Sequence, residues 1–283
     1  MDETKSAGSV LITGASTGIG KACALYLDNL GFTTFAGVRT EEDAAVLKEE
    51  ASGALKTVML EVTEPCQITS ARDEVANDLK GAGLTGLVNN AGIPLGGPLE
   101  FLSIPDFRYE LEVNLIGAVA VTQAFLPMIR QAHGRIINMS SLSGFIALPF
   151  MSPYAATKFG LRAITDSLRV ELRPWGISVS IIEVGDVDTP LWAKSQEVIE
   201  KAAREMPDRG WELYGPIIEL KERFQPHGIS PVEVARVVEH ALTSRRPKAR
   251  YVLGRDAKLF DLLRRLPVSI RDRLISSQLP EYG

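Results

Sequence analysis

The sequence predicts an α/β fold, in which one doubly wound parallel sheet of about seven strands carries helices on both faces. Two observations favour this fold. Short runs of apolar and β-branched residues alternate along the chain with longer amphipathic segments, a pattern typical of parallel sheets that helices cover on both sides. The first apolar run is followed directly by a glycine-rich turn and a helix, which is the context of a phosphate-binding turn.

Composition limits the classes of function. The chain has 283 residues, of which 45% are hydrophobic, and we expect a single domain over residues 1–283 because no repeat or linker divides it. A formal net charge of −4 argues against a general nucleic-acid-binding protein. The two cysteines and three histidines show no metal-ligand spacing, so we expect no metal site.

The two ends of the chain bear on its location. The N-terminus is short and polar, and no run of about 18 apolar residues occurs, so we expect a cytoplasmic protein without an integral membrane segment. The tail over residues 256–283 is basic and amphipathic. Such a tail packs as an ordinary docking helix, packs against a partner subunit or lies on a membrane surface.

A glycine-rich turn connects the first expected strand, residues 9–13, to the first expected helix, residues 21–30. Gly14, Gly18 and Gly20 follow the spacing G-x3-G-x-G. Small residues let the backbone approach a pyrophosphate, and a helix N-terminus supplies free N–H groups. The combination indicates a Rossmann-type dinucleotide site, with a tight turn that binds nothing as the alternative.

The end of the second expected strand, residues 32–38, bears on the choice of cofactor, because a doubly wound fold meets the adenosine ribose there. Arg39 follows this strand, and the first acidic residue is Glu41. Since a guanidinium suits a 2′-phosphate, we expect NADP, with NAD as the alternative. In the other interpretation Arg39 is a solvated loop charge.

The candidate catalytic pair is Tyr154 and Lys158, at i and i+4 of an expected helix over residues 154–173. We expect the ammonium to lower the pKa of the phenol, so that the tyrosine exchanges a proton with an alcohol or a carbonyl. Ser141, in the preceding loop, would bring its hydroxyl to the same substrate oxygen. The alternative is a solvated lysine over a half-buried tyrosine.

Further elements complete the alternation. Asn114 falls inside a long helix over residues 104–131, where its amide either bonds to its own helix or holds a water beside Lys158.

Residues 189–230 are irregular and bear aromatic residues, and we expect a mobile substrate lid there. The remaining expected helices lie at 41–50, 65–80 and 231–244, and the remaining strands at 56–62, 84–88, 135–140, 177–183 and 249–253.

The assembled motifs resemble the short-chain dehydrogenase/reductase family over roughly residues 8–190. They are Thr13-Gly14-x-x-x-Gly18-x-Gly20, Asn89-Asn90-Ala91-Gly92, Asn114, Ser141 and Tyr154-x-x-x-Lys158. The resemblance implies that Tyr154 is the acid/base and that Lys158 lowers its pKa and binds the nicotinamide ribose. It also implies that Ser141 binds the substrate oxygen and that Asn114 supports a proton-relay water. Residues 240–260 look like the retinol, hydroxysteroid and 3-hydroxybutyrate dehydrogenase branch.

The resemblance extends to the cofactor, with two departures from the family pattern. Val184-Gly185 stands where Pro-Gly is usual after the sixth strand, and Glu61 replaces the usual aspartate near the adenine. Thr189 matches a family threonine at the nicotinamide end. With Arg39 included, the residues expected to bind the cofactor are Gly14, Ser16, Thr17, Gly18, Ile19, Gly20, Arg39, Glu61, Val62, Asn90, Ala91, Gly92, Tyr154, Lys158, Gly185, Val187 and Thr189.

We therefore expect an oxidoreductase that transfers a hydride between NADP(H) and a secondary alcohol or ketone. The resemblance and the aromatic-bearing lid favour an apolar steroid-, retinoid- or lipid-like substrate. The alternatives are an NAD-dependent dehydrogenase of smaller hydroxy compounds, a non-catalytic NAD(P)-binding redox sensor, and an epimerase or dehydratase on a related scaffold. Family members associate through the helices that hold Asn114 and Tyr154, so we expect a homodimer or homotetramer.

Overall fold

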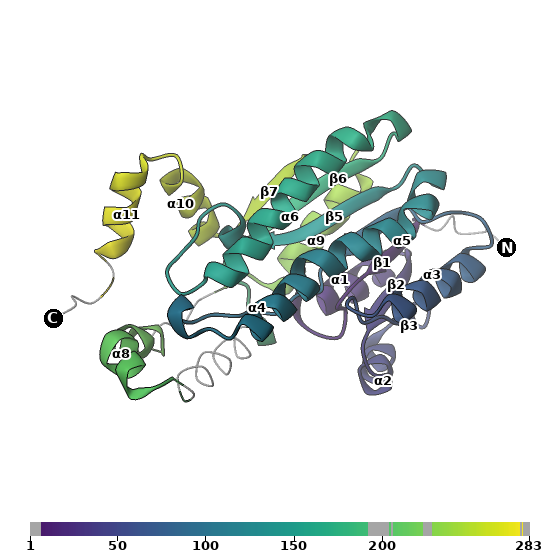
Figure 1. Cartoon of the computed structure of the whole chain (residues 1–283). Helices are drawn as coiled ribbons and strands as arrows, with labels where there is room; N and C mark the ends of the chain where they lie inside the picture. Colours follow the sequence, from purple (N-terminus) through teal and green to yellow (C-terminus); the bar gives the residue numbers. More distant parts are fainter. Residues whose placement is uncertain (1–6, 192–203, 205, 223–227, 278, 280–283) are drawn as a thin grey trace.

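A seven-stranded sheet forms the centre of the molecule (Figure 1). The computed structural model describes residues 7–191, 204, 206–222, 228–277 and 279. Within these residues every strand pair is parallel and the strand order is β3-β2-β1-β4-β5-β6-β7, which confirms the predicted doubly wound fold. The strands are β1 (Ser9–Ile12), β2 (Thr33–Val38), β3 (Lys56–Met59), β4 (Gly86–Asn89), β5 (Arg135–Ser141), β6 (Ser178–Val184) and β7 (Arg250–Leu253).

The first strand, β1, shows why the sheet needs a helical layer on each face. Val10 and Ile12 belong to one apolar cluster together with Leu27. Leu11, between them in sequence, belongs to a second cluster together with Phe125. All five side chains are fully buried. Because successive side chains of a strand point to opposite faces, an unbroken apolar strand is stable only with apolar helices on both sides.

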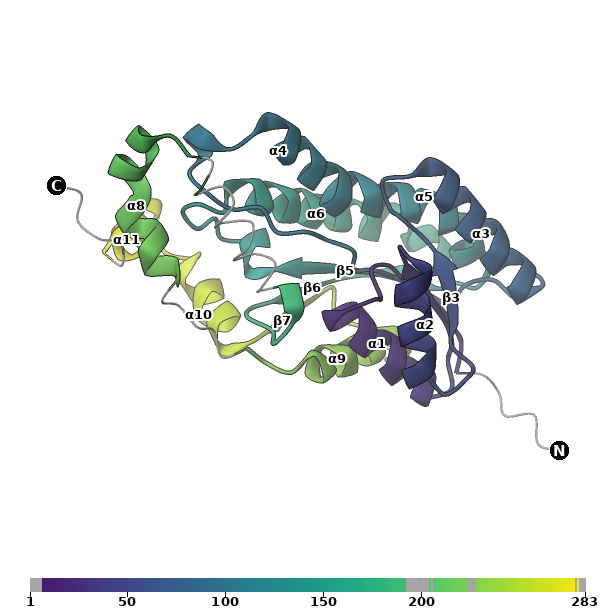
Figure 2. The same cartoon turned by 90° about the horizontal axis from the view of Figure 1, so that it is seen from below.

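Two helical layers cover the sheet, as two views show (Figure 1 and Figure 2). One layer holds α1 (Gly18–Asn29), α2 (Glu41–Glu50) and α9 (Pro231–Thr243), and the other holds α3 (Pro65–Leu79), α4 (Ile104–Leu111), α5 (Gly117–Gln131) and α6 (Ser152–Glu171). These bounds lie close to the predicted ones. The helix α1 starts earlier than the predicted residue 21, because Gly18, Ile19 and Gly20 already form its first turn.

The long helix predicted over residues 104–131 is interrupted in the structure. Between α4 and α5 the chain forms a π-helical segment, Glu112–Ile116, which contains the candidate residue Asn114. Single π-turns inside helices are rare and frequently occur at functional sites. A pattern of apolar residues does not separate one widened turn from a regular helix, so the sequence analysis missed it.

The same segment, Ile104–Gln131, bears on the expected absence of a membrane span. Among the described residues it is the one helix whose length and apolar composition would suit a membrane crossing. Val121, Phe125 and Ile129 of this helix are fully buried in the core cluster on its face of the sheet. We identify it as a core helix on this packing, and the absence of an integral membrane segment stays a prediction.

Three helices of the C-terminal part gather at one end of the sheet (Figure 1). They are α8 (Asp208–Glu222), α10 (Arg255–Leu263) and α11 (Val268–Ser276). Ala257 and Phe260 of α10 pack against Phe145 in a small apolar cluster. Leu259 and Leu262 of the same helix are 58% and 60% exposed. The amphipathic character predicted for the tail is therefore present in the part that the structure describes.

The predicted lid over residues 189–230 lies only partly within the described residues. Trp192 and Phe224, two of its aromatic residues, lie outside them. The described part includes α8, which the sequence analysis did not separate from the irregular region. Tyr214 of α8 makes edge-to-face contacts with Phe101 and Phe150, at ring-centroid distances of 6.0 and 5.9 Å. These contacts attach α8 to the loops that follow β4 and β5.

Candidate cofactor and active site

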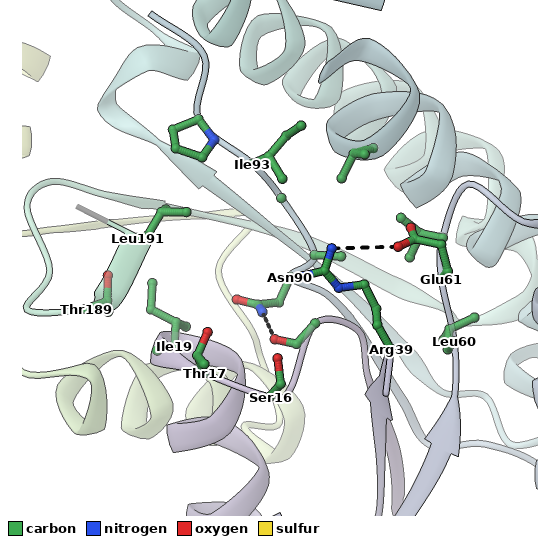
Figure 3. Close-up of a pocket in the computed structure, with 17 residues that line it drawn as sticks. Ser16, Thr17, Ile19, Arg39, Leu60, Glu61, Asn90, Ile93, Thr189 and Leu191 are labelled. Carbon is green, nitrogen blue, oxygen red and sulfur yellow. Dashed lines mark hydrogen bonds and ion pairs between the residues drawn. The ribbon is translucent and has the colours of Figure 1, made fainter. Parts of the chain in front are cut away.

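The turn between β1 and α1 borders a cleft at the carboxyl edge of the sheet (Figure 3). Gly14 and Gly18 have φ values of +62° and +56°, a region that favours glycine. A Cβ atom on Gly14 would lie 2.8 Å from the Cα of Ala91, and one on Gly18 would lie 3.2 Å from the Cβ of Thr189. A Cβ on Gly20 would overlap the carbonyl oxygen of Gly14. Gly14 and Gly18 thus allow the positive φ angles of the turn, and all three glycines allow neighbouring chain segments to approach closely.

The N-terminus of α1 faces this cleft, where Ser16, Thr17 and Ile19 line it (Figure 3). Thr17 is the N-cap residue, and no side chain caps this end of the helix. An uncapped N-terminus leaves backbone N–H groups and the positive end of the helix dipole for a ligand. Such an end suits an anionic pyrophosphate. The residues present therefore fit a dinucleotide cofactor.

Asn90 connects the ends of β1 and β4. Its Nδ2 donates to the carbonyl oxygens of Thr13 and Gly14, at 3.0 Å each. The Thr13 Oγ1 accepts in turn from the backbone N–H groups of Asn90 and Ala91, at 2.9 and 3.0 Å. These strands flank the point at which the strand order reverses, which is where doubly wound sheets bind ligands. Ala91 and Gly92 then continue along the wall of the cleft.

Arg39 and Glu61 lie across the cleft from Thr189 and Leu191 (Figure 3). The guanidinium of Arg39 is 3.9 Å from the Glu61 carboxylate, and the arginine side chain is 55% exposed. An exposed pair at this distance contributes little. Arg39 therefore lines the cleft as predicted, with a guanidinium that is only weakly held and can turn to an anionic ligand.

The candidate catalytic side chains come together at the carboxyl end of β5. Tyr154 and Lys158 lie one turn apart on α6, with the lysine Nζ 5.5 Å from the centroid of the tyrosine ring. Lys158 is buried, and its ammonium donates to the carbonyl oxygen of Met139 at 3.1 Å. The hydroxyl of Ser141, the last residue of β5, lies near enough to the Tyr154 phenol to lower its pKa, and it accepts from the N–H of Ser143 at 3.2 Å. The loop between β5 and α6 thus folds back as predicted.

The pKa of Tyr154 lies above its ordinary value, and the charge of Lys158 is not among the causes of this shift, so the prediction that Lys158 lowers the pKa stays a prediction. Burial of the phenol raises the pKa most, the charge of Glu110 raises it further, and the hydroxyl of Ser141 lowers it. Burial also lowers the pKa of Lys158 to about 8, against an opposing effect of Glu110. Desolvation disfavours the charged form of both side chains.

Asn114 is buried in the π-helical segment, where its amide binds the loop after β4. Its Nδ2 donates to the carbonyl oxygen of Ile93 at 2.8 Å, and its Oδ1 accepts from the Ile93 N–H at 2.7 Å. Longer contacts of 3.4 Å reach Glu110 and Thr157. Of the two alternatives, an amide bonded to its own helix does not describe these two shortest bonds, and a water held beside Lys158 stays a prediction. Asn114 instead ties a cleft-lining residue to the helix that precedes the catalytic pair.

Most of the residues predicted to bind the cofactor line the cleft, and a few lie elsewhere. Those outside it are Gly20, Tyr154, Lys158, Gly185 and Val187. The N–H of Gly185 donates to the carbonyl oxygen of Leu253 at 2.8 Å, and a Cβ on this glycine would overlap the Asp256 carboxylate. Val187 forms a bridge with Ile229. Gly185 and Val187 thus contact later segments of the chain and do not line the cleft. They lie in the loop where Val184-Gly185 replaces the Pro-Gly that is usual in the family.

The sequence analysis missed several apolar residues of the cleft: Leu60, Ile93, Pro94, Val113 and Leu191. Most of them lie within two residues of predicted positions in sequence. An apolar side chain next to a motif gives no signal of its own, because a buried core residue has the same composition. Their position in the cleft follows from the fold and not from a pattern.

Comparison with known proteins gives consistent matches. Residues 8–200 match the family described as short chain dehydrogenase. The 17-beta-hydroxysteroid dehydrogenase type 6 of Bos taurus is 38% identical over 282 residues, and retinol dehydrogenase 5 of Homo sapiens is 38% identical over 285 residues. Each alignment covers 96% of this chain and 89% of the relative. A short-chain dehydrogenase from Streptomyces avermitilis superposes with a TM-score of 0.78 at 26% identity and 97% coverage of both chains.

We expect Gly14→Ala to lower the free energy of unfolding by roughly 2–3 kcal/mol, because the new methyl group meets Ala91 at a strained positive φ. Gly31→Ala is the matched control. Gly31 has a φ of +84° and no heavy atom within 4 Å of a Cβ, so it carries backbone strain alone, about 1 kcal/mol. Urea unfolding followed by circular dichroism measures both variants, and equal losses would contradict the close approach of the turn to Ala91.

Proposed function

Because the chain belongs to the short-chain dehydrogenase/reductase family, we propose that it moves a hydride between NADP(H) and a secondary alcohol or ketone on an apolar, steroid- or retinoid-like molecule. Membership makes the chain an NAD(P)-dependent oxidoreductase that acts on CH–OH groups. The choice of nucleotide, the class of substrate and the roles of individual residues are the proposal.

The observation that carries the proposal is the convergence of Ser141, Tyr154 and Lys158. Two hydroxyl groups meet at the carboxyl end of β5, next to a buried ammonium. This edge of the sheet also carries the glycine turn and Asn90, which border the cofactor cleft. A protein that only senses the nucleotide has no use for two hydroxyl groups beside a buried ammonium. Their convergence therefore argues against a non-catalytic redox sensor.

The roles of the side chains follow from their positions. The nicotinamide supplies the hydride in reduction, and accepts it in oxidation, when the cofactor is bound. The turn at Gly14 and Gly18 would hold its pyrophosphate. Ser141 donates a hydrogen bond to the substrate oxygen and orients the carbonyl. Tyr154 donates its proton to the same oxygen in reduction and takes it back in oxidation, and the positive charge of Lys158 favours the phenolate that remains.

The apolar character of the substrate has two supports. Ile93, Pro94 and Leu191 line the cleft, and the contact between Tyr214 and Phe150 places an aromatic pair near the loop before α6. Two relatives with 38% identity over nearly the whole chain are named for retinol and for a 17β-hydroxysteroid. An NAD-dependent dehydrogenase of smaller hydroxy compounds remains the alternative function, and the choice of nucleotide separates the two.

Assembly and location stay predictions. Ile116 in the π-helical segment and Phe159 on α6 are 48% and 42% exposed, which supports a homodimer or homotetramer through these helices. Leu259 and Leu262 on α10 support contact of a cytoplasmic protein with a membrane surface. Sedimentation of a micromolar sample, with and without anionic vesicles, tests both expectations. A monomer that does not bind vesicles would contradict them.

Tyr154→Phe tests the catalytic proposal. We expect kcat to fall at least about a hundredfold, because the variant has no proton to exchange with the substrate oxygen. The nicotinamide cofactor should still bind, because the glycine turn and the other residues of the cleft are unchanged. Tyr109→Phe is the matched control, since it removes the same hydroxyl from an exposed position on α4. Turnover at the wild-type rate in Tyr154→Phe would contradict the assigned role and favour the sensor.

Arg39→Ala tests the choice of nucleotide. We expect NADPH to bind at least tenfold more tightly than NADH, a difference of about 1.4 kcal/mol, and Arg39→Ala to lose that preference. A fluorescence titration with each nucleotide gives the two dissociation constants. Arg72→Ala removes an equal charge from α3, outside the cleft, and should keep the preference. Equal or tighter binding of NADH by the unchanged protein would favour the NAD-dependent alternative.

A further inference from the structure

A carboxyl group that the proposed mechanism does not use lies behind the catalytic pair. Glu110, on α4, lies one helical turn before Asn114 and is fully buried. Its Oε1 accepts from the N–H of Leu95 at 2.9 Å and from the Nδ2 of Asn114 at 3.4 Å. Its Oε2 is buried and makes no hydrogen bond with any described residue. A buried carboxylate with one unsatisfied oxygen costs more free energy than the neutral carboxylic acid at the same place.

The groups whose charges interact with Glu110 are those of the catalytic pair. Among the described titratable residues, the charge of Lys158 on α6 acts on Glu110, and the charge of Glu110 acts on Tyr154 and Lys158. The helix α6 packs against α4 and against the π-helical segment, which brings these side chains into one buried region. The amide of Asn114 lies within 3.4 Å of both Glu110 and Thr157, the residue before Lys158.

The proton affinities of the carboxyl and the ammonium are close to each other. Burial raises the pKa of Glu110 to about 8, although the hydrogen bond from Leu95 and the charge of Lys158 lower it. Burial lowers the pKa of Lys158 to about 8. At neutral pH the carboxyl therefore holds its proton in the folded protein. Movement of a proton between two groups of similar pKa requires little free energy.

We propose that Glu110 is a positioning residue that holds a reserve proton behind Lys158 and exchanges it with the lysine through a bridging water. This inference rests on the proposed function. In reduction, the O–H bond of Tyr154 breaks as its proton goes to the oxygen of the substrate, which has received the hydride. Lys158 then returns a proton to the phenolate, and Glu110 returns one to the lysine amine. Glu110 ends as a carboxylate and regains its proton from solvent, and oxidation runs the same steps in reverse.

Two roles of Glu110 have to be separated: the hydrogen bond that it accepts from the Leu95 N–H, which is structural, and the supply of a proton to Lys158. A glutamine at this position keeps an acceptor oxygen for the Leu95 N–H and nearly the same shape, but it has no proton that titrates. A structural role would therefore survive the change to glutamine. A role as a proton reserve would not.

The test compares Glu110→Gln with Glu112→Gln, which removes an exposed carboxylate at the start of the π-helical segment, two residues along the chain. We expect Glu110→Gln to lower kcat by about tenfold and to remove one ionisation near pH 8 from the pH profile of kcat. The dissociation constant for the nicotinamide cofactor should not change. Glu112→Gln should keep the wild-type rate and profile. An unchanged profile in Glu110→Gln, with or without a loss of rate, would overturn the proposal.

An infrared titration of the unchanged protein, with isotope-labelled glutamate, gives a second readout that needs no activity. We expect a protonated carboxyl band at pH 7 that disappears as the pH rises through about 8. The absence of this band at pH 7 would overturn the proposal even where Glu110→Gln does not fold. A protein that turns over no alcohol or ketone would contradict the proposed function, whereas wild-type turnover with an unchanged profile in Glu110→Gln would contradict this inference alone.

Discussion

The reversal of strand order between β1 and β4 is the constraint on which the site depends. Chain segments leave these strands in opposite directions, so a crevice remains at their carboxyl ends. The side chain of Asn90 bonds to the end of β1, and the bare Cα of Gly14 lets the two loops approach each other. The uncapped N-terminus of α1 then faces the crevice. A fold of this kind supplies an anion-binding cleft before any catalytic side chain is considered.

A second constraint is the burial of charge at the end of β5. Lys158 and Glu110 lie where water reaches poorly, so each favours its neutral form more than it would at a surface. The phenol of Tyr154 is likewise held in its protonated form. The fold thus shifts the proton affinities of all three groups away from their ordinary values. The amide of Asn114, 3.4 Å from Glu110 and from Thr157, connects the helices that carry them.

The sequence predicted those features that depend on local spacing. The i, i+4 relation of Tyr154 and Lys158 needs only one helix, and the role of Gly14 needs only one turn. The π-helical segment at Asn114 and the place of Glu110 depend on packing between helices distant in sequence. The raised pKa of Tyr154 has the same origin, because spacing along one helix does not show how far packing removes a phenol from water. Apolar residues of the cleft such as Leu60 resemble core residues and were missed for that reason.

The most direct test of the central claim follows deuterium from NADPH that carries deuterium at both C4 positions of the nicotinamide. The protein would be offered a panel of steroid-like ketones, and the alcohols formed would be examined by mass spectrometry. The account predicts an alcohol with one deuterium on the carbinol carbon, because the hydride passes directly between cofactor and substrate held at Ser141 and Tyr154. An alcohol that carries no label would contradict direct transfer at this site.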